Sequence, residues 1–215
     1  MGFGRRELRM PGREEAPVGR GALAYEVPER HVVLRTGLLG PYPEGYGVAE
    51  FALGCFWGAE RRYWQVLAGV WTTVVGFQGG FTPFPVDDEV RTGMTGHAET
   101  VRVVYDPARV SYEDLLVLFW EAHDPTQGFR QGNDVGTHVR SLIFVRDGAQ
   151  RDAAEGSLAV YQKCLTEAGY GEITTEILAA EEYPFYPASA LHQQYLAHNP
   201  GGYCGLGGTG VLYRA

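Results

Sequence analysis

The hydrophobic pattern of the chain changes its period within residues 48–67, VAEFALGCFWGAERRYWQVL. Val48 to Leu53 is a short, mostly apolar run that predicts a buried β-strand, and Phe56 to Leu67 places aromatic and aliphatic residues at helical spacing. Gly54 marks the corner between the two elements. Cys55 is then the last residue before the helix. A strand that leads directly into a helix predicts a fold in which sheet and helix pack together.

The rest of the sequence extends this pattern. Further strands are predicted at 70–77, 100–105, 141–145 and 173–179, and further helices at 112–123 and about 149–168. Residues 81–96 contain Pro, Gly and Asp and predict a long loop. The order β-α-β-β-α-β is that of a split βαβ unit. We therefore predict an α/β fold of the α+β type, a two-layer sandwich with a ferredoxin-like core and a mixed, mainly antiparallel sheet.

The length of 215 residues favours one domain with an extension. Residues 1–30 are rich in Arg, Glu, Gly and Pro without apolar periodicity, and turn residues follow at 40–45. We therefore expect residues 1–47 to form an N-terminal arm that is partly ordered or wraps the core. Residues 48–215 are expected to form a single catalytic domain. Its glycine-rich C-terminal tail is expected to be mobile from about residue 198.

Charge and composition exclude several classes of function. The net charge is −8 and the basic residues form no stripe, so a nucleic-acid surface is not expected. Lys163 is the only lysine, which leaves P-loop and Schiff-base chemistry almost no candidate. No apolar run is long enough for a membrane span, and no secretory signal is apparent, so a cytoplasmic protein is expected. His192 and His198 would not share a helix face, and no metal is implied.

Cys55, Cys164 and Cys204 are too few and too far apart for a disulfide framework or a zinc site. The position of Cys55 before a helix directs its sulfur at free backbone N–H groups, which lowers a thiol pKa and creates a nucleophile. A buried structural cysteine is the alternative. Cys164 lies in a predicted helix and matches no catalytic pattern, so we expect it to pack.

Several short motifs surround this cysteine in the sequence. They are GCFWGAE (54–60), TGHAE (95–99), VRVVYDP (101–107), HDPTQ (123–127), RQGNDVGT (130–137), HQQYL (192–196) and NPGGYCGLGG (199–208). Together they resemble the peptide methionine sulfoxide reductases of the A type, over about residues 48–211. The resemblance implies an oxidoreductase for oxidative stress and protein repair, which reduces the S epimer of methionine sulfoxide, free or in proteins.

The resemblance also implies roles for individual residues. The thiolate of Cys55 attacks the sulfoxide sulfur while Glu99, a protonated carboxylic acid, gives a proton to the leaving oxygen. The resulting sulfenic acid is resolved by Cys204 to a disulfide. Asp134 belongs to the hydrogen-bond network around Cys55, although a turn aspartate is the simpler interpretation of its local sequence.

The resemblance implies a substrate pocket and a reductant as well. Phe56 and Trp57 are expected to hold the methyl group of the substrate, although Phe56 is also plausible as a core aromatic. Thioredoxin or a similar dithiol is the expected partner that reduces the disulfide by exchange, and no cofactor is expected. No cysteine follows Cys204, so a relay of two cysteines is predicted.

The sequence departs from this family at the sulfoxide oxygen. Two tyrosines usually bind that oxygen, but the matching positions here are Asp87 and Val139. Loss of one oxyanion-type donor typically costs ~10²–10³ in rate. Glu99 would then donate the proton alone, with Asp87 or His138 as a replacement contact. The alternative function is a weakly active or inactive relative that binds methionine sulfoxide.

A cysteine hydrolase and a dinucleotide-binding protein have less support in the sequence. A hydrolase could use Cys55, His97 and Asp134 as nucleophile, base and orienter, but it would give no role to Cys204. Residues 205–210, GLGGTG, match a dinucleotide-binding pattern, but only five residues follow and no helix can form there. We therefore discount this match.

Overall fold

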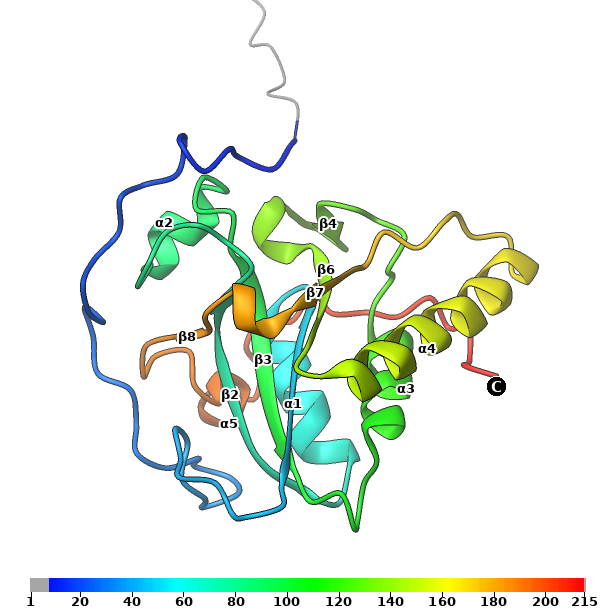
Figure 1. The fold of residues 1–215 in the computed structure, drawn as a ribbon, viewed down its shortest axis with the longest axis horizontal. Coiled ribbons are helices and arrows are strands. Elements are labelled where there is room, and N and C mark those ends of the chain that lie inside the picture. Colours follow the sequence, from blue (N-terminus) through cyan, green and yellow to red (C-terminus); the bar gives the residue numbers. More distant parts are fainter. Residues whose placement is uncertain (1–7, 215) are drawn as a thin grey trace, which may run out of the picture.

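The computed structural model describes residues 8–214, and the first seven residues of the predicted arm lie outside the described part. Its main feature is a six-stranded sheet (Figure 1). The strand order is β7 (Glu176–Ala179), β6 (Ser141–Val145), β1 (Gly47–Leu53), β3 (Ala98–Tyr105), β2 (Val70–Gln78) and β8 (Tyr186–Pro187). Only β6 and β7 pair in parallel. The mixed, mainly antiparallel sheet was predicted correctly.

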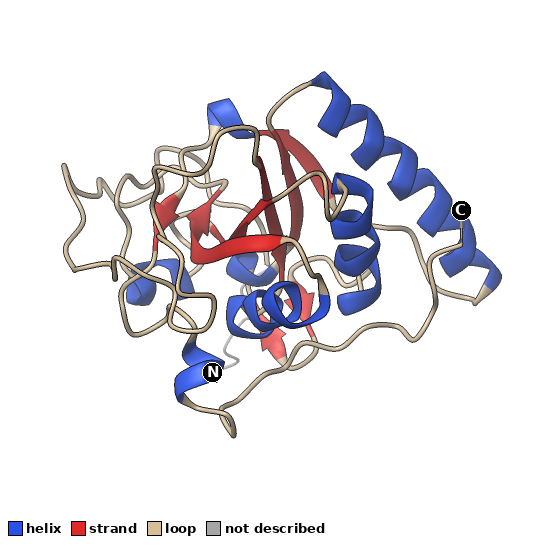
Figure 2. Cartoon of the chain, turned by 90° about the horizontal axis from the view of Figure 1, so that it is seen from below, coloured by secondary structure: helices blue, strands red, loops and turns tan. Residues whose placement is uncertain are grey.

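Three long helices, α1 (Phe56–Val66), α3 (Tyr112–Ala122) and α4 (Gly148–Glu167), pack on one face of this sheet (Figures 1 and 2). The main hydrophobic core lies between them and alternate residues of β1 and β3, such as Phe51 and Val103, which are fully buried. Ser111 caps α3 by accepting the N–H of Asp114. Helix packing on one face gives the two layers that the sequence predicted.

Residues 81–96 are not the continuous loop that we predicted. They contain a short helix, α2 (Asp87–Arg91). The carboxylate of Glu89 accepts the backbone N–H of Val86 at 3.1 Å, and Val90 is buried in a small core with Phe77. A five-residue helix has little intrinsic stability, so α2 depends on this local cap and on the burial of Val90, and the tertiary burial is not visible in local propensity.

The strand predicted at 173–179 starts later, at Glu176. The preceding residues are held by other partners, since the N–H and hydroxyl of Thr174 both donate to the carbonyl of Pro125. The remaining elements are short, and the sequence pattern did not indicate them. They are β4 (Arg130–Gln131), β5 (Asp134–Val135), the 3₁₀ turns at Thr137–Val139 and Ala180–Glu182, and α5 (Tyr195–His198).

The described part of the arm, residues 8–46, runs past α2 and β8 before it enters β1 (Figure 1). His31 is fully buried and contacts the hydroxyl of Thr73 through Nε2 at 2.9 Å. Its Nδ1 accepts the N–H groups of Val33 and Leu34. The Thr73 hydroxyl donates in turn to Glu60 on α1. The arm is thus connected by hydrogen bonds to the helix that begins at the candidate nucleophile.

Candidate active site

A cavity of about 180 Å³ lies where β1 meets α1. Seven of the eight predicted site residues line it, and only Cys204 does not. The lining residues are Cys55, Phe56, Trp57, Asp87, Arg91, Glu99, Asp134, His138, Val139, His192 and Tyr203. They come from segments far apart in the sequence, which the sheet and the loops beyond its strand ends bring together.

Cys55 lies at the turn between β1 and α1. Gly54 has φ +95°, and a side chain there would meet Gln131, so glycine is required for this turn. The backbone N–H groups of Trp57 and Gly58, in the first turn of α1, favour the Cys55 thiolate, the influence that the sequence predicted, but no side-chain hydrogen bond from Cys55 caps the helix. The direction of the pKa shift differs from our prediction. Burial, and then the nearby Glu99 charge, raise the pKa of the thiol to about 12, and the two N–H groups only partly oppose them.

Glu99 projects into the same cavity from β3 and is 8% exposed. Its Oε2 accepts the backbone N–H of Phe56 at 3.0 Å, so it lies beside the residue that follows Cys55. Burial raises its pKa to about 8. Glu99 therefore keeps its proton at neutral pH, as a general acid must.

Cys204 approaches the site from the C-terminal tail, in which residues 202–209 form no helix or strand. Its sulfur lies only 2.3 Å from the point that a Cβ would occupy on Gly58, in the first turn of α1. Cys55 precedes that same turn, so both cysteines lie at the start of α1. The neighbouring Tyr203 places its hydroxyl 3.5 Å from the carboxylate of Asp134.

Two aromatic side chains wall the cavity. Phe56 is buried against Phe77, with 5.8 Å between the ring centroids. Trp57 stacks on Tyr195 at 3.8 Å, and its Nε1 donates to Nδ1 of His192 at 3.2 Å. The indole is therefore held by two residues of the HQQYL motif. A fixed apolar wall beside a thiol and a carboxylic acid is suited to a substrate with an apolar group next to a polar, reducible centre.

A family model described as peptide methionine sulfoxide reductase matches residues 47–209. The chain belongs to this family. Its members reduce methionine sulfoxide, and the chain is accordingly an oxidoreductase.

Similar proteins from other organisms agree with this assignment. A peptide methionine sulfoxide reductase MsrA of Streptomyces griseus is 63% identical over 94% of this chain and 90% of its own length. That of Pseudomonas aeruginosa (strain PAO1) is 55% identical over 96% and 91%. The solved structure of methionine sulfoxide reductase A of Corynebacterium diphtheriae has a TM-score of 0.81 and 41% identity, covering 91% of this chain and 93% of that one.

Within this reductase fold, the two positions that lack tyrosine have different surroundings. Val139 is 2% exposed and offers no polar atom. Asp87 lies with its Oδ1 3.8 Å from Nε2 of His192. Because His192 Nδ1 accepts from Trp57, Nε2 carries the proton and directs it at Asp87. The pKa of His192 is lowered, chiefly by burial and against the opposing charge of Asp87, so the ring stays neutral. His138 also lines the cavity, and its buried Nδ1 has no hydrogen-bond partner among residues 8–214.

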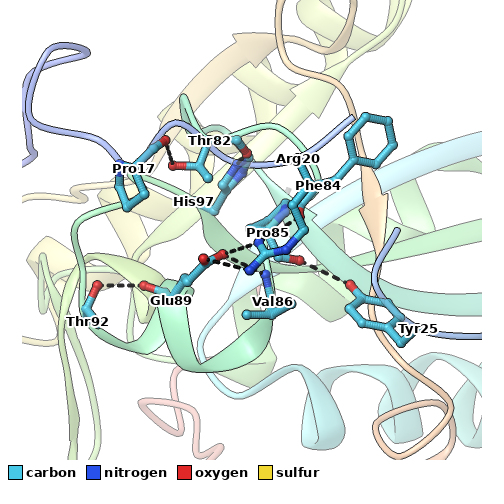
Figure 3. A network of polar contacts seen from close by, with 10 residues as sticks. All are labelled: Pro17, Arg20, Tyr25, Thr82, Phe84, Pro85, Val86, Glu89, Thr92 and His97. Carbon is cyan, nitrogen blue, oxygen red and sulfur yellow. Dashed lines mark hydrogen bonds and ion pairs between the residues drawn. The ribbon is translucent and has the colours of Figure 1, made fainter. Parts of the chain in front are cut away.

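The arm holds α2, the helix that carries Asp87 and Arg91 to the reductase cavity (Figure 3). Arg20 makes two hydrogen bonds with the Glu89 carboxylate, at 2.7 and 2.9 Å. The hydroxyl of Tyr25 donates to the carbonyl of Pro85 at 3.2 Å. Sequence reasoning gave the arm no such role, since no local pattern connects Arg20 to residues 69 positions later.

The structure does not support a hydrolase triad. Both ring nitrogens of His97 are used away from the cavity, Nε2 with the carbonyl of Thr82 at 2.7 Å and Nδ1 with the N–H of Gly80 at 3.2 Å. Burial lowers its pKa to about 4. Within residues 8–214 we find no cluster of His, Cys, Asp or Glu suited to a metal ion, and no helix long and apolar enough to cross a membrane.

Sequence reasoning did not identify Arg91 and Tyr203, which also line the cavity. Arg91 lies one helical turn after Asp87, but the helix itself was not predicted. Tyr203 precedes Cys204, and its position beside the predicted resolving cysteine was the one available signal.

Proposed function

We propose that this reductase acts on the S epimer of methionine sulfoxide, free or in proteins, with Cys55 as nucleophile and Glu99 as general acid. One observation carries the proposal. Glu99 is a buried carboxyl whose pKa is raised to about 8, and it shares a small cavity with Cys55. The cavity therefore holds a nucleophilic atom together with the proton that a departing oxygen needs.

The first step is a two-electron transfer. The Cys55 thiolate attacks the sulfoxide sulfur, and Glu99 protonates the sulfoxide oxygen to a hydroxyl group. The hydroxyl group then passes from the substrate sulfur to the Cys55 sulfur, as the sulfur–oxygen bond of the substrate and the transient sulfur–sulfur bond both break. The substrate is reduced to the thioether, and Cys55 is oxidised to a sulfenic acid. Phe56 and Trp57 hold the methyl group of the substrate. Asp134 belongs to the hydrogen-bond network around Cys55, and its carboxylate accepts the Tyr203 hydroxyl at 3.5 Å.

The second step joins the two cysteines. The Cys204 thiol attacks the sulfenic acid, a disulfide forms, and water leaves. The position of Cys204 at Gly58 supports this step, because it places the second thiol at the first turn of α1, the helix that Cys55 precedes. The tail from about residue 198 supplies that movement, and residues 48–215 act as one catalytic domain. The start of the family match at residue 47 supports this division.

The third step restores the two thiols by exchange with an external dithiol, and we infer that thioredoxin supplies it. Cys204 is half-buried in an irregular segment, where a second protein can reach a disulfide. No prosthetic group takes part in this cycle. The cycle needs a compartment that keeps thioredoxin reduced, and we place the protein in the cytoplasm. Repair of oxidised methionine under oxidative stress is its physiological role.

The first experiment is chiral chromatography of racemic N-acetyl-methionine sulfoxide after incubation with the protein and dithiothreitol. We expect loss of the S epimer alone, no loss with Cys55→Ser, and a rate lower by about 10²–10⁴ with Glu99→Gln. An undiminished rate in Glu99→Gln would remove Glu99 as the acid. Stoichiometric binding of the S epimer without turnover would favour the binding-only alternative, which the family relatives do not support.

The second experiment separates the two later steps. Cys204→Ser is expected to complete one turnover and to accumulate a sulfenic acid on Cys55 that a dimedone-type probe labels. Multiple turnovers with thioredoxin, thioredoxin reductase and NADPH should be lost. Cys164→Ser is the matched control, because Cys164 packs beside Arg214 on the tail and has no role in the relay. Equal loss in both variants would contradict the assignment of Cys204.

A further inference from the structure

A second cavity adjoins the one that holds Cys55, and it also has a volume of about 180 Å³. The arm residues Leu8, Arg9, Pro11 and Glu15 form one side of it, and Arg9 and Glu15 form an ion pair with each other. Residues 91–94 and 135–137 form the other side. The proposed catalytic cycle uses none of this space.

The two cavities have walls in common. Arg91 lines both of them. Asp134, His138 and Val139 belong to the first cavity, and the intervening residues 135–137 belong to the second. A polypeptide whose oxidised methionine enters the first cavity can therefore continue past Arg91 into the second.

Arg91 is exposed and, within residues 8–214, makes no hydrogen bond or ion pair. The carboxylates near it have other partners. Asp87 faces His192, and Glu89 is held by Arg20. Glu15, which also lines the second cavity, is paired with Arg9. The guanidinium thus keeps its N–H donors available at the entrance between the two cavities. A planar donor group of this kind is suited to a carboxylate, which it binds through two parallel hydrogen bonds.

The second cavity also has apolar surface for the stem of a bound side chain. Leu8 and Val135, at its rim, are 52% and 40% exposed. Met94 lines it as well. A glutamate side chain would place its methylene groups on this surface and its carboxylate at Arg91.

We infer that Arg91 and the second cavity form a subsite for the polypeptide that flanks an oxidised methionine, and that Arg91 binds an acidic side chain next to it. The inference rests on the proposed function, because the methionine sulfoxide must occupy the first cavity. Arg91 lines the same cavity as Cys55, so the acidic residue belongs beside the methionine in the sequence.

The net charge of the chain makes this inference testable. At −8, the molecule as a whole repels an acidic peptide. A preference for glutamate over glutamine must therefore come from a local cation. Arg91 is the cation that lines both cavities, and its removal should reverse the preference.

The test uses capped pentapeptides that contain methionine S-sulfoxide in a glycine and alanine background. One neighbouring position carries Glu, Gln or Lys, on either side of the sulfoxide. We expect kcat/KM for the Glu peptide to exceed that of the Gln peptide by about two- to fivefold at low salt, the size expected for a partly exposed ion pair. The ratio should fall at high salt, and the Lys peptide should be the poorest substrate.

Three variants assign the effect. Arg91→Gln should bring the Glu/Gln ratio to one or below, and Arg91→Lys should retain part of it, because the charge remains without the planar fork. Arg109→Gln removes the same charge from the turn between β3 and α3, beyond the end of β3 opposite to Glu99, and should leave the ratio unchanged. Equal rates for the Glu and Gln peptides in the wild-type protein, or a Glu preference that survives Arg91→Gln, would overturn the subsite.

The uncharged N-acetyl-methionine sulfoxide amide separates this inference from the proposed function. If the wild-type protein does not reduce the S epimer of the amide, the proposed function fails. Calorimetric titration of Cys55→Ser with the Glu and Gln peptides then still tests the subsite, and equal affinities would overturn it. If the amide is reduced and the Glu/Gln ratio is one, only the subsite fails.

Discussion

Glu99 is the residue that we expect to determine the pH dependence of the first chemical step. Burial raises its pKa to about 8 and that of Cys55 to about 12. Below pH 8 the thiolate fraction grows about tenfold per pH unit while Glu99 stays protonated, so the rate rises. Above pH 8 each gain in thiolate is offset by the loss of the Glu99 proton, and the rate should level off.

Single-turnover rates measured from pH 6 to 10 test this prediction. In Glu99→Gln the residual rate should keep rising through pH 8, because that variant has no proton to lose at this position. If the wild-type rate does not level off near pH 8, or if the Glu99→Gln rate levels off at the same pH, the ionisation of Glu99 does not determine the pH dependence.

Gly58 is a second residue with a specific role. A methyl group there would lie 2.3 Å from the Cys204 sulfur and 2.9 Å from Cβ of Leu206, so Gly58→Ala must displace the tail. We expect normal formation of the Cys55 sulfenic acid. Disulfide formation should be at least about tenfold slower, which corresponds to an increase of about 1.4 kcal/mol in its activation free energy.

Intact-protein mass spectrometry after one turnover measures this delay. Gly156→Ala is the control, because a Cβ at Gly156, in α4, meets nothing within 4 Å. It should stabilise the protein by about 1 kcal/mol and leave both steps unchanged. Rapid disulfide formation in Gly58→Ala would mean that Cys204 reaches Cys55 by another route.

At the scale of elements, the contact between the arm and α2 should affect substrate binding. The helix has five residues and depends on tertiary contacts, among them the two hydrogen bonds between Arg20 and Glu89. Arg20→Gln should loosen α2 and raise KM for peptide substrates about two- to fivefold, with a loss of stability of about 1 kcal/mol or less.

A double-mutant cycle with Glu89→Gln measures this coupling. Arg151→Gln, which breaks the exposed pair with Glu155 on α4, is the control and should leave KM unchanged. Additive effects of Arg20→Gln and Glu89→Gln on KM would contradict a role of their contact in holding α2.

At the scale of the whole molecule, the buried titratable groups predict a maximum of stability near pH 6.5. Burial lowers the pKa of His31, His97 and His123 to about 4. Between about pH 4 and 6.5 the unfolded chain therefore binds more protons at these residues, and their contribution to stability is lost as the pH falls. Burial raises the pKa of Glu60 and Glu99 to about 8. Their folded forms hold the extra protons from about pH 4.5 to 8. The two glutamates therefore offset part of the gain from the three histidines below pH 6.5, and stability declines as the pH rises from 6.5 to 8.

Urea unfolding from pH 4 to 9 measures this curve. The two glutamates imply a slope of up to about 2.7 kcal/mol per pH unit above pH 6.5. In His123→Gln the free energy of unfolding should fall less steeply as the pH decreases from 6.5 to 4, because only two buried histidines then remain to be protonated on unfolding. A midpoint that still increases between pH 7 and 8 would show that Glu60 and Glu99 are ionised in the folded protein.

Much of the site could be predicted because its residues lie in motifs with a local physical meaning. The strand, glycine and helix around Cys55 are adjacent in the sequence, so their local pattern predicts them, and Glu99 lies in the next motif along the chain. By contrast, α2 with its Arg91, and the contact between Arg20 and Glu89, depend on segments that meet only in the folded chain. A local hydrophobic pattern does not predict contacts of this kind.

The sequence by itself determined the order of the main strands and helices and the family, and it supplied the proposed nucleophile, acid and second cysteine. Hydrophobic period and turn residues act over a few neighbours, which is why they can be read without a structure. Only the tertiary structure decided which charges these groups carry. Burial raises the pKa of Cys55 against the two N–H groups that lower it, and burial keeps the proton on Glu99. Desolvation depends on what surrounds a group in three dimensions, and the linear sequence does not contain that information.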